Sequence, residues 1–230
     1  MYKLAQKYKV DYITDVLSAQ FEQDWPKTLW EWDAFESDDA TYFKGKMGIY
    51  RDCMYPEPVA AIEFARVANL PSILPAAFYQ LSRVTTGSNY KEHLKAGLTW
   101  QAGLRSARWS DLTKEDLVCL AAGKEQLSHY LMILQKGLIE EIPAEETKCR
   151  QAWKLMPALR SDDILHDLLE ICKPDKLPGV FMCKSCRSKV NEKARTERLG
   201  LWGLLPKLFR VPRPGSLNLV FASMALSDSA

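Results

Sequence analysis

Cysteine spacing is the strongest chemical signal in this chain of 230 residues. Cys183 and Cys186 form a C-x2-C pair, a spacing that lets two thiolates reach one tetrahedral metal ion from a tight turn. Cys149 and Cys172 lie upstream, so the chain contains a C-x22-C-x10-C-x2-C set. We expect Cys149, Cys183 and Cys186 to be ligands of a structural zinc ion.

The sequence leaves the fourth zinc ligand open. The candidates are Glu145, Glu146 and His166. In the alternative interpretation, Cys149 and Cys172 are buried core residues and no metal is bound. A redox-active C-x-x-C pair is less favoured, because no βαβ pattern surrounds it.

No set of residues typical of an enzyme stands out. His93, His129 and His166 are the three histidines, and each is isolated within a helical pattern. Isolated histidines of this kind are more often satisfied surface or core residues than catalytic bases. A nucleophile elbow, a P-loop, a dinucleotide-binding loop and an H-E-x-x-H helix are all missing from the sequence. We therefore expect no enzymatic activity, although a Cys–His pair that forms only in space stays an alternative.

A basic segment at 184–213 supports a second interpretation. It holds nine Lys and Arg residues against two Glu, a net charge of +7, whereas the whole chain carries only +2. Such a segment can attract nucleic-acid phosphates, which would make the chain a zinc-stabilised nucleic-acid-binding protein. Its only aromatic residues are Trp202 and Phe209, too few for a base-stacking platform. A solvated helical face is therefore favoured, and nucleic acid is not the expected partner.

The composition is that of a globular protein, with 47% hydrophobic and 26% charged residues. Charges are interspersed from Met1 onward, so there is no apolar signal core. No stretch approaches the roughly 20 apolar residues of a membrane-spanning helix. We expect an intracellular protein, cytoplasmic or nuclear, that makes no membrane contact and keeps its cysteines reduced.

The elements that position the cysteines are expected to be helices. Residues 2–24 predict two short helices that break at Val10 and stop before Pro26. Residues 58–68 and 71–81 carry apolar stripes at helical spacing, and the short link between them predicts a helical hairpin.

The segment 26–56 is expected to be irregular. It combines many aromatic residues with an acidic cluster of Glu31, Asp33, Glu36, Asp38 and Asp39. Charge is easily accommodated on a surface loop, so we interpret the acids as solvated. A binding loop is the alternative.

Further helices are expected in the second half. Thr113 and Asp116 match a capping box, and the helix that follows is expected to end at Gly137. Residues 161–163 open another helix, and 189–202 predict the last one. No alternation of apolar and polar residues is long enough for a strand, so the predicted fold class is all-α.

Several segments together resemble a known family. The run Ala61–Tyr79 resembles the helical segment that follows the BTB/POZ domain in a large group of fungal BTB/POZ proteins. Leu4–Val10 resembles the helix that closes the BTB/POZ fold itself. Matches to later parts of the same group are Leu112–Leu117, Gly123–Glu125, Cys149-Arg150, the Cys183/Cys186 pair and 201–209.

The resemblance implies a division of the chain. A remnant of the C-terminal BTB/POZ helices would occupy 1–24, a body of helical hairpins 57–138, and a small cysteine-containing helical module 139–209. A compositional shift at Pro143, among four glutamates, supports the last boundary. We expect 210–230 to be a disordered tail.

The resemblance also implies a function. The chain would be a non-catalytic protein–protein interaction module, similar to the C-terminal region of a BTB/POZ adaptor, with other proteins as its partners. Most of the BTB fold would lie upstream of Met1. A homo-oligomer is therefore expected only if that upstream fold is present.

Overall fold

The computed structural model describes residues 2–43, 57–88, 106–154, 159, 163–173 and 182–212. It contains no strand in these ranges, which confirms the predicted all-α fold class. The elements are α1 Tyr2–Lys7, α2 Asp11–Asp24, α3 Leu29–Phe43, α4 Pro58–Ala68, α5 Leu74–Ser82, the 3-10 helix η3 Trp109–Asp111, α7 Lys114–Glu140, α8 Thr147–Lys154, α9 Ile164–Cys172 and α10 Lys184–Leu208.

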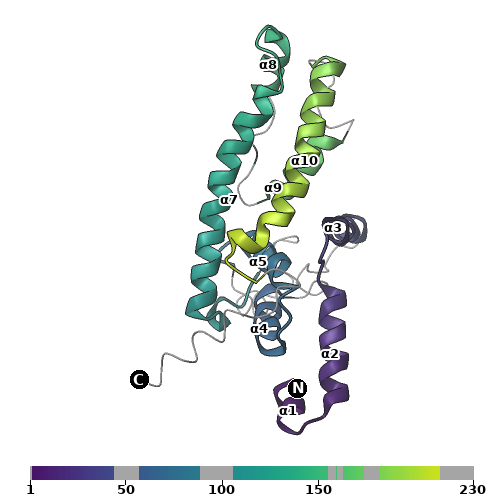
Figure 1. The fold of residues 1–230 in the computed structure, drawn as a ribbon, viewed down its shortest axis with the longest axis vertical. Helices are drawn as coiled ribbons and strands as arrows, with labels where there is room; N and C mark the ends of the chain where they lie inside the picture. Colours follow the sequence, from purple (N-terminus) through teal and green to yellow (C-terminus); the bar gives the residue numbers. More distant parts are fainter. Residues whose placement is uncertain are drawn as a thin grey trace.

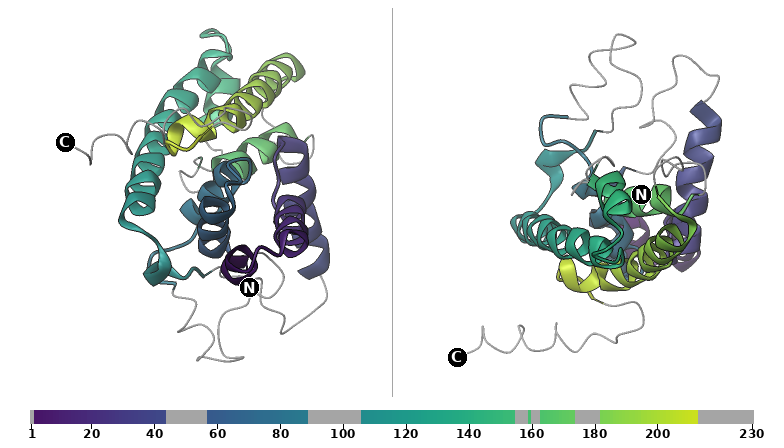
Figure 2. Two further views of the ribbon diagram at one scale, coloured as in Figure 1. Left: turned by 60° about the horizontal axis from the view of Figure 1, so that its bottom comes forward. Right: turned by 90° about the horizontal axis from the view of Figure 1, so that it is seen from above.

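The helices surround a central hairpin. The α4–α5 pair lies between α7 on one side and α2 and α3 on the other, while α7 and α10 extend away as two long rods (Figures 1 and 2). Every residue of α5 is buried, and α5 contacts α4, α7 and α10. Within the described ranges, no helix combines the length and apolar character needed to cross a bilayer.

The first two helices form as expected. The break at Val10 and the stop before Pro26 are confirmed, because α1 ends at Lys7 and α2 ends at Asp24. No residue of α2 is buried. Its main anchor is Phe21, whose ring stacks on Phe64 of α4 with the ring centroids 3.9 Å apart.

The prediction of an irregular segment at 26–56 is wrong for its first half, which forms α3. Thr28 and Glu31 make a reciprocal cap at the start of this helix. The Thr28 hydroxyl accepts from the Glu31 N–H at 3.2 Å, and the Glu31 carboxylate accepts from the Thr28 and Lys27 N–H groups. These backbone bonds lower the pKa of Glu31. This reciprocal cap satisfies N–H groups that a helix start otherwise leaves without partners. Residues 44–56, the rest of the segment, lie outside the described ranges.

The acidic cluster of α3 is not simply solvated. Two of its members form ion pairs with buried arginines of other helices. Glu36 accepts two bonds from Arg83 at the end of α5, and Asp33 accepts two from Arg198 of α10. These acids therefore hold α3 against the body; the side chains of Asp38 and Asp39 lie outside the described part.

The α4–α5 hairpin forms as predicted, with one shift. Glu57 caps α4 by accepting from the Val59 and Ala60 N–H groups, and Asn69 closes it in the left-handed conformation at φ 55°. The second helix begins at Leu74 and not at residue 71, because 71–73 form a turn first.

The long helices exceed their predicted lengths. Gly137 does not end α7, which continues to Glu140. The last helix covers Lys184–Leu208 and not only 189–202. Just after the helix, Arg210 adopts the left-handed conformation at φ 53°, and the Val211 N–H donates to the Pro206 carbonyl at 2.9 Å. That bond is the mark of a Schellman motif.

The capping residue of α7 gives a first testable prediction. The Thr113 hydroxyl accepts from the Asp116 N–H at 3.1 Å and donates to the Asp116 carboxylate at 2.8 Å. Thr113→Ala is expected to lower the free energy of unfolding by about 1 kcal/mol. Urea unfolding measures the change, and Thr113→Ser, which keeps the hydroxyl, should retain most of the stability.

Candidate metal centre

Four side chains meet at the far end of the α7–α10 pair. Glu146, Cys149, Cys183 and Cys186 each offer one ligand atom, and these atoms all lie within 4.8 Å of one another. They come from the start of α8 and the start of α10, which lie at the same end of the molecule (Figure 1). We call this group the Cys3Glu cluster.

Local helix geometry positions both halves of the cluster. Glu146 directly precedes α8, and Cys149 follows it by three residues, so the two side chains share one face. The Cys149 thiol lies 3.7 Å from the Glu146 carboxylate. Cys183 is the N-cap of α10, and Cys186 is three residues further along the helix. Each half is therefore fixed by three-residue spacing at a helix start.

Backbone N–H groups point at two of the sulfur atoms. The Cys183 N–H donates to Cys149 Sγ at 3.4 Å, and the Cys186 N–H donates to Cys183 Sγ at 3.5 Å. This second bond, followed by the thiol of Cys186, lowers the pKa of Cys183. The amide end of a helix also favours a nearby anion, so the fold is prepared for thiolate at this position.

The pKa of the buried Cys186 thiol shifts in the opposite direction, upward. Burial raises the pKa of Cys186 to about 12, and the neighbouring thiols of Cys183 and Cys149 add to the rise. Three sulfur atoms this close cannot all carry negative charge without a compensating cation. A bound divalent metal would supply that charge and convert the thiols to thiolates.

The cluster is half enclosed. Cys149 and Cys186 are buried, whereas Glu146 and Cys183 are exposed. A metal ion could therefore enter from solution and be held between two inner and two outer ligands. The Cys3Glu cluster suits a cation, because its four side chains can provide four anionic ligand atoms close to one another.

The structure separates the sequence candidates. It brings Cys149, Cys183 and Cys186 together, and of the three candidates for the fourth position it places Glu146 beside them. His166 lies on α9, with Nε2 3.9 Å from Glu170, and Glu145 is exposed outside the cluster. The E-x2-C spacing of Glu146 and Cys149 was the signal that could have selected this glutamate.

Cys172 is not part of the cluster. Its Sγ lies 3.7 Å from the backbone carbonyl of Asn191, and burial raises the pKa of its thiol. It packs between α9 and α10 as a small, partly buried side chain. The four-cysteine set that could be written from the sequence therefore does not form one site.

The histidines lie in separate places. His129 is exposed on α7, and His166 is on α9, while His93 lies outside the described ranges.

The basic segment 184–213 is more engaged in contacts within the protein than a solvated face would be. Arg198 is buried and donates to the Leu165 carbonyl as well as to Asp33, and Lys193 pairs with Glu197 at 3.1 Å.

Comparison of the chain with family models, with curated proteins and with solved structures found no match. The resemblance to fungal BTB/POZ proteins and the adaptor role that it implies therefore stay predictions. Of the chemistry expected from the sequence, the structure provides a cysteine–glutamate group that could hold a metal ion.

Proposed function

We propose that the Cys3Glu cluster binds one structural zinc ion, and that the chain is a non-catalytic protein-interaction module whose distal end this ion stabilises. One observation carries the proposal: four ligand atoms within 4.8 Å of one another, drawn from segments that are far apart in the chain. Chance surface contacts between acids and thiols seldom place three cysteines together.

The donor set favours zinc. Soft thiolate ligands select Zn²⁺, Cu⁺ or iron–sulfur clusters, and a single four-ligand site of this kind suits tetrahedral Zn²⁺. With Zn–S bonds of about 2.3 Å, the sulfur atoms around a tetrahedral ion lie roughly 3.8 Å apart. The cluster would need to contract by no more than about 1 Å to reach that geometry.

A four-ligand shell supports a structural role. Catalytic zinc sites keep one position open for water or substrate, whereas structural sites fill all four with protein ligands. Here the ion would fasten α8 to the start of α10. The same part of α8 is also tied to the end of α7, because Arg150 Nε donates to the Ile142 carbonyl just after α7 at 3.1 Å.

The long helices support an interaction role. α7 exposes Leu117, Val118, Met132 and Ile133, and α10 exposes Leu199. Exposed apolar side chains that lie together on a surface are typical of contact sites for other proteins, and we infer such a site around the adjacent pair Met132 and Ile133. A rigid pair of rods would hold such side chains in fixed positions, and zinc at the tip would keep the rods rigid.

Metal analysis tests the zinc site. Protein purified without chelator is expected to contain about one equivalent of zinc. Cys149→Ser and Glu146→Gln should lower that content, the cysteine change more strongly. Cys172→Ser and Glu145→Gln are matched controls outside the cluster and should keep full zinc. A wild-type content below about half an equivalent would contradict the site.

Metal removal should act locally. Chelation is expected to speed amide hydrogen exchange in α8 and in the first turns of α10, because the ion no longer joins them. The buried helix α5 lies at the other end of the rods and should keep its protection. Unchanged exchange in α8 after complete zinc removal would argue against a structural role.

Reconstituted binding tests the interaction role. Proteins retained from a cell extract would be purified, and their affinity for the wild-type chain measured by calorimetry. We expect a stoichiometric complex that Met132→Glu on α7 weakens at least tenfold. Binding that no substitution on α7 or α10 affects would contradict the proposal for these helices.

The nucleic-acid alternative rests on the same zinc site together with the 184–213 segment. Arg198 and Lys193 are engaged within the protein, which leaves fewer cations for phosphate. The measurement is DNA affinity against salt concentration. An affinity that falls steeply with salt would favour this alternative, since phosphate neutralisation releases counterions.

A further inference from the structure

The three cysteines of the Cys3Glu cluster differ in their access to solvent. Cys149 and Cys186 are 3% and 2% exposed, whereas Cys183 is exposed at the start of α10. Cys119 and Cys172 are half-buried, so Cys183 is the most accessible cysteine of the described ranges. A small reagent in solution would therefore reach the Cys183 sulfur first.

A second sulfur atom stands ready beside it in the same helix turn. Cys183 is the N-cap of α10, and Cys186 follows three residues later. The Cys186 N–H donates to Cys183 Sγ at 3.5 Å, and the two sulfur atoms lie within 4.8 Å of each other. Cysteine pairs with this spacing at a helix start are a common arrangement for reversible disulfides. Rotation of the two side chains would bring the sulfur atoms into bonding distance.

Cys149 is the alternative partner, but it belongs to another helix. Within the described ranges, α7 and α9 pack closely along α10, whereas α8 makes no comparable contact with it. The 3.4 Å bond from the Cys183 N–H to Cys149 Sγ lies inside the cluster itself. The nearness of Cys149 thus depends on the cluster, while that of Cys186 is set by the helix turn.

We propose that Cys183 is an oxidation site, at which a hydroperoxide joins Cys183 to Cys186 in a disulfide, expels the zinc ion and frees α8 from α10. The inference rests on the proposed zinc site and names how that site is regulated. It makes the C-x-x-C pair a switch and not a catalyst, so no βαβ unit is required around it.

The reaction balances with hydrogen peroxide as the oxidant. The Cys183 sulfur attacks one peroxide oxygen, the O–O bond breaks, and the second oxygen leaves and takes up a proton to become water. The Cys186 sulfur then attacks the resulting sulfenic acid, the S–O bond breaks, and a second water leaves. Two metal-bound thiolates, one H₂O₂ and two protons give one disulfide, free Zn²⁺ and two waters. The sulfur atoms lose two electrons, which the peroxide oxygens gain.

The position of this disulfide decides its structural effect. Oxidation removes two of the four ligands, and Glu146 with Cys149 is too small a donor set for a tetrahedral site. The disulfide stays within one turn of α10, so it does not replace the ion as a link to α8. Amide hydrogen exchange should therefore rise in α8, while the first turn of α10 keeps its protection. Chelation alone is expected to loosen both.

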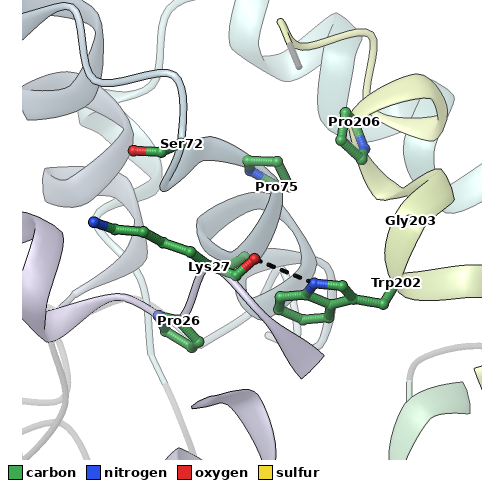
Figure 3. Close-up of a pocket in the computed structure, with 8 residues that line it drawn as sticks. Pro26, Lys27, Ser72, Pro75, Trp202, Gly203 and Pro206 are labelled. Atoms are coloured by element: carbon green, nitrogen blue, oxygen red, sulfur yellow. Dashed lines mark hydrogen bonds between the residues drawn. The ribbon is translucent and has the colours of Figure 1, made fainter. Parts of the chain in front are cut away.

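Trp202 provides an internal control near the other end of α10, about 28 Å further along the helix than Cys183. Its ring centroid lies 5.7 Å from that of the buried Trp32, and its indole N–H donates to the Lys27 carbonyl at 3.4 Å in the wall of a pocket (Figure 3). Its indole N–H resonance should not move on oxidation. A shift there would overturn the proposal of a local switch.

The test treats the zinc-loaded full chain with hydrogen peroxide and follows released zinc with a coloured chelator. We expect zinc release, a mass loss of about 2 Da for the two hydrogens, and a Cys183–Cys186 linkage in the non-reducing digest. Dithiothreitol with added zinc should restore the starting protein. Cys119→Ser and Cys172→Ser are controls outside the cluster and should release zinc at the wild-type rate.

Zinc-free protein separates the thiol chemistry from the metal. Cys149→Ser keeps the C-x-x-C pair and should form the disulfide at close to the wild-type rate. Cys183→Ser leaves only the buried Cys149 and Cys186 in the cluster, so it should form a disulfide there at least tenfold more slowly. Equal rates for these two variants would overturn the role of Cys183.

Two further results would contradict the proposal. A Cys149–Cys183 disulfide would join α8 to α10 covalently and so overturn the release of α8. Zinc-loaded protein in which the pair stays reduced under peroxide would remove this inference and leave the metal site standing. Conversely, protein that binds no zinc but still forms the Cys183–Cys186 disulfide would remove the metal site and leave the oxidation site.

Discussion

Replacing Arg83 with alanine is expected to lower the free energy of unfolding by about 3–5 kcal/mol, the usual loss when one partner of a buried ion pair is removed. Arg83 joins three helices. Its guanidinium donates to both carboxylate oxygens of Glu36, at 2.7 and 3.0 Å, and to Asp163 at 2.9 Å. It also lies over the Trp32 ring at 5.5 Å. The variant would leave two carboxylates close together in a largely buried site.

The loss should depend on pH with a definite sign. Burial already raises the pKa of Asp163 in the native protein. Arg83 now opposes this rise, so the pKa of Asp163 would rise further without the guanidinium. A carboxyl whose pKa is raised on folding destabilises the protein only when it is ionised, so its cost is absent at low pH and grows as pH rises. The deficit of Arg83→Ala should thus be larger at pH 7 than near pH 4.

Urea unfolding at the two pH values measures this effect. Lys189→Ala, which removes an exposed cation of α10, is the control and should change stability by less than about 0.5 kcal/mol at either pH. A deficit for Arg83→Ala that is under about 1 kcal/mol, or that does not change with pH, would show that the pair is exposed to solvent in solution.

The same ion pairs show where sequence reasoning reaches its limit. Glu36 and Asp163 are 47 and 80 residues away from Arg83 along the chain. No local pattern connects residues so far apart. Acids on α3 therefore resembled the charges of a solvated loop, although the Thr28/Glu31 capping box was present in the sequence as a helix signal. The local cap starts the helix, whereas the long-range ion pairs determine where it packs.

Local signals performed better wherever the chemistry was local. Pro26 ended α2 and Thr113 began α7, because each acts on the backbone within a few residues. The prediction that the helix ends at Gly137 is wrong, because glycine is only weakly unfavourable inside a helix that tertiary contacts support. For the Cys3Glu cluster, the C-x2-C spacing identified Cys183 and Cys186, but the meeting of α8 with α10 could only come from the fold.

A close contact between the backbone of α7 and a buried ring gives the other large effect. Gly123 of α7 faces the ring of Phe209, and a methyl group added to Gly123 would overlap that ring. Phe209 cannot move away easily, since it is 0% exposed and stacks on Phe78 of α5 with the ring centroids 5.7 Å apart. Gly123 thus sets the distance between α7, the end of α10 and α5.

Gly123→Ala is therefore expected to destabilise the protein although alanine is the better helix former. The propensity gain is about 1 kcal/mol, whereas overpacking costs typically 1–3 kcal/mol and more where a rigid ring is displaced. We expect a net loss of about 2 kcal/mol. Gly137→Ala is the matched control in the same helix, because its added Cβ would meet only the flexible Lys193 side chain at 3.9 Å. That variant should gain up to about 1 kcal/mol.

A second substitution separates overpacking from other causes. Phe209→Leu alone should lose stability, since it removes buried ring contacts. Combined with Gly123→Ala, it should lose less than the sum of the two single changes, because the smaller side chain makes room for the methyl group. Strict additivity in this double-mutant cycle, or a gain from Gly123→Ala alone, would show that α7 and the end of α10 do not pack as closely as the structure requires.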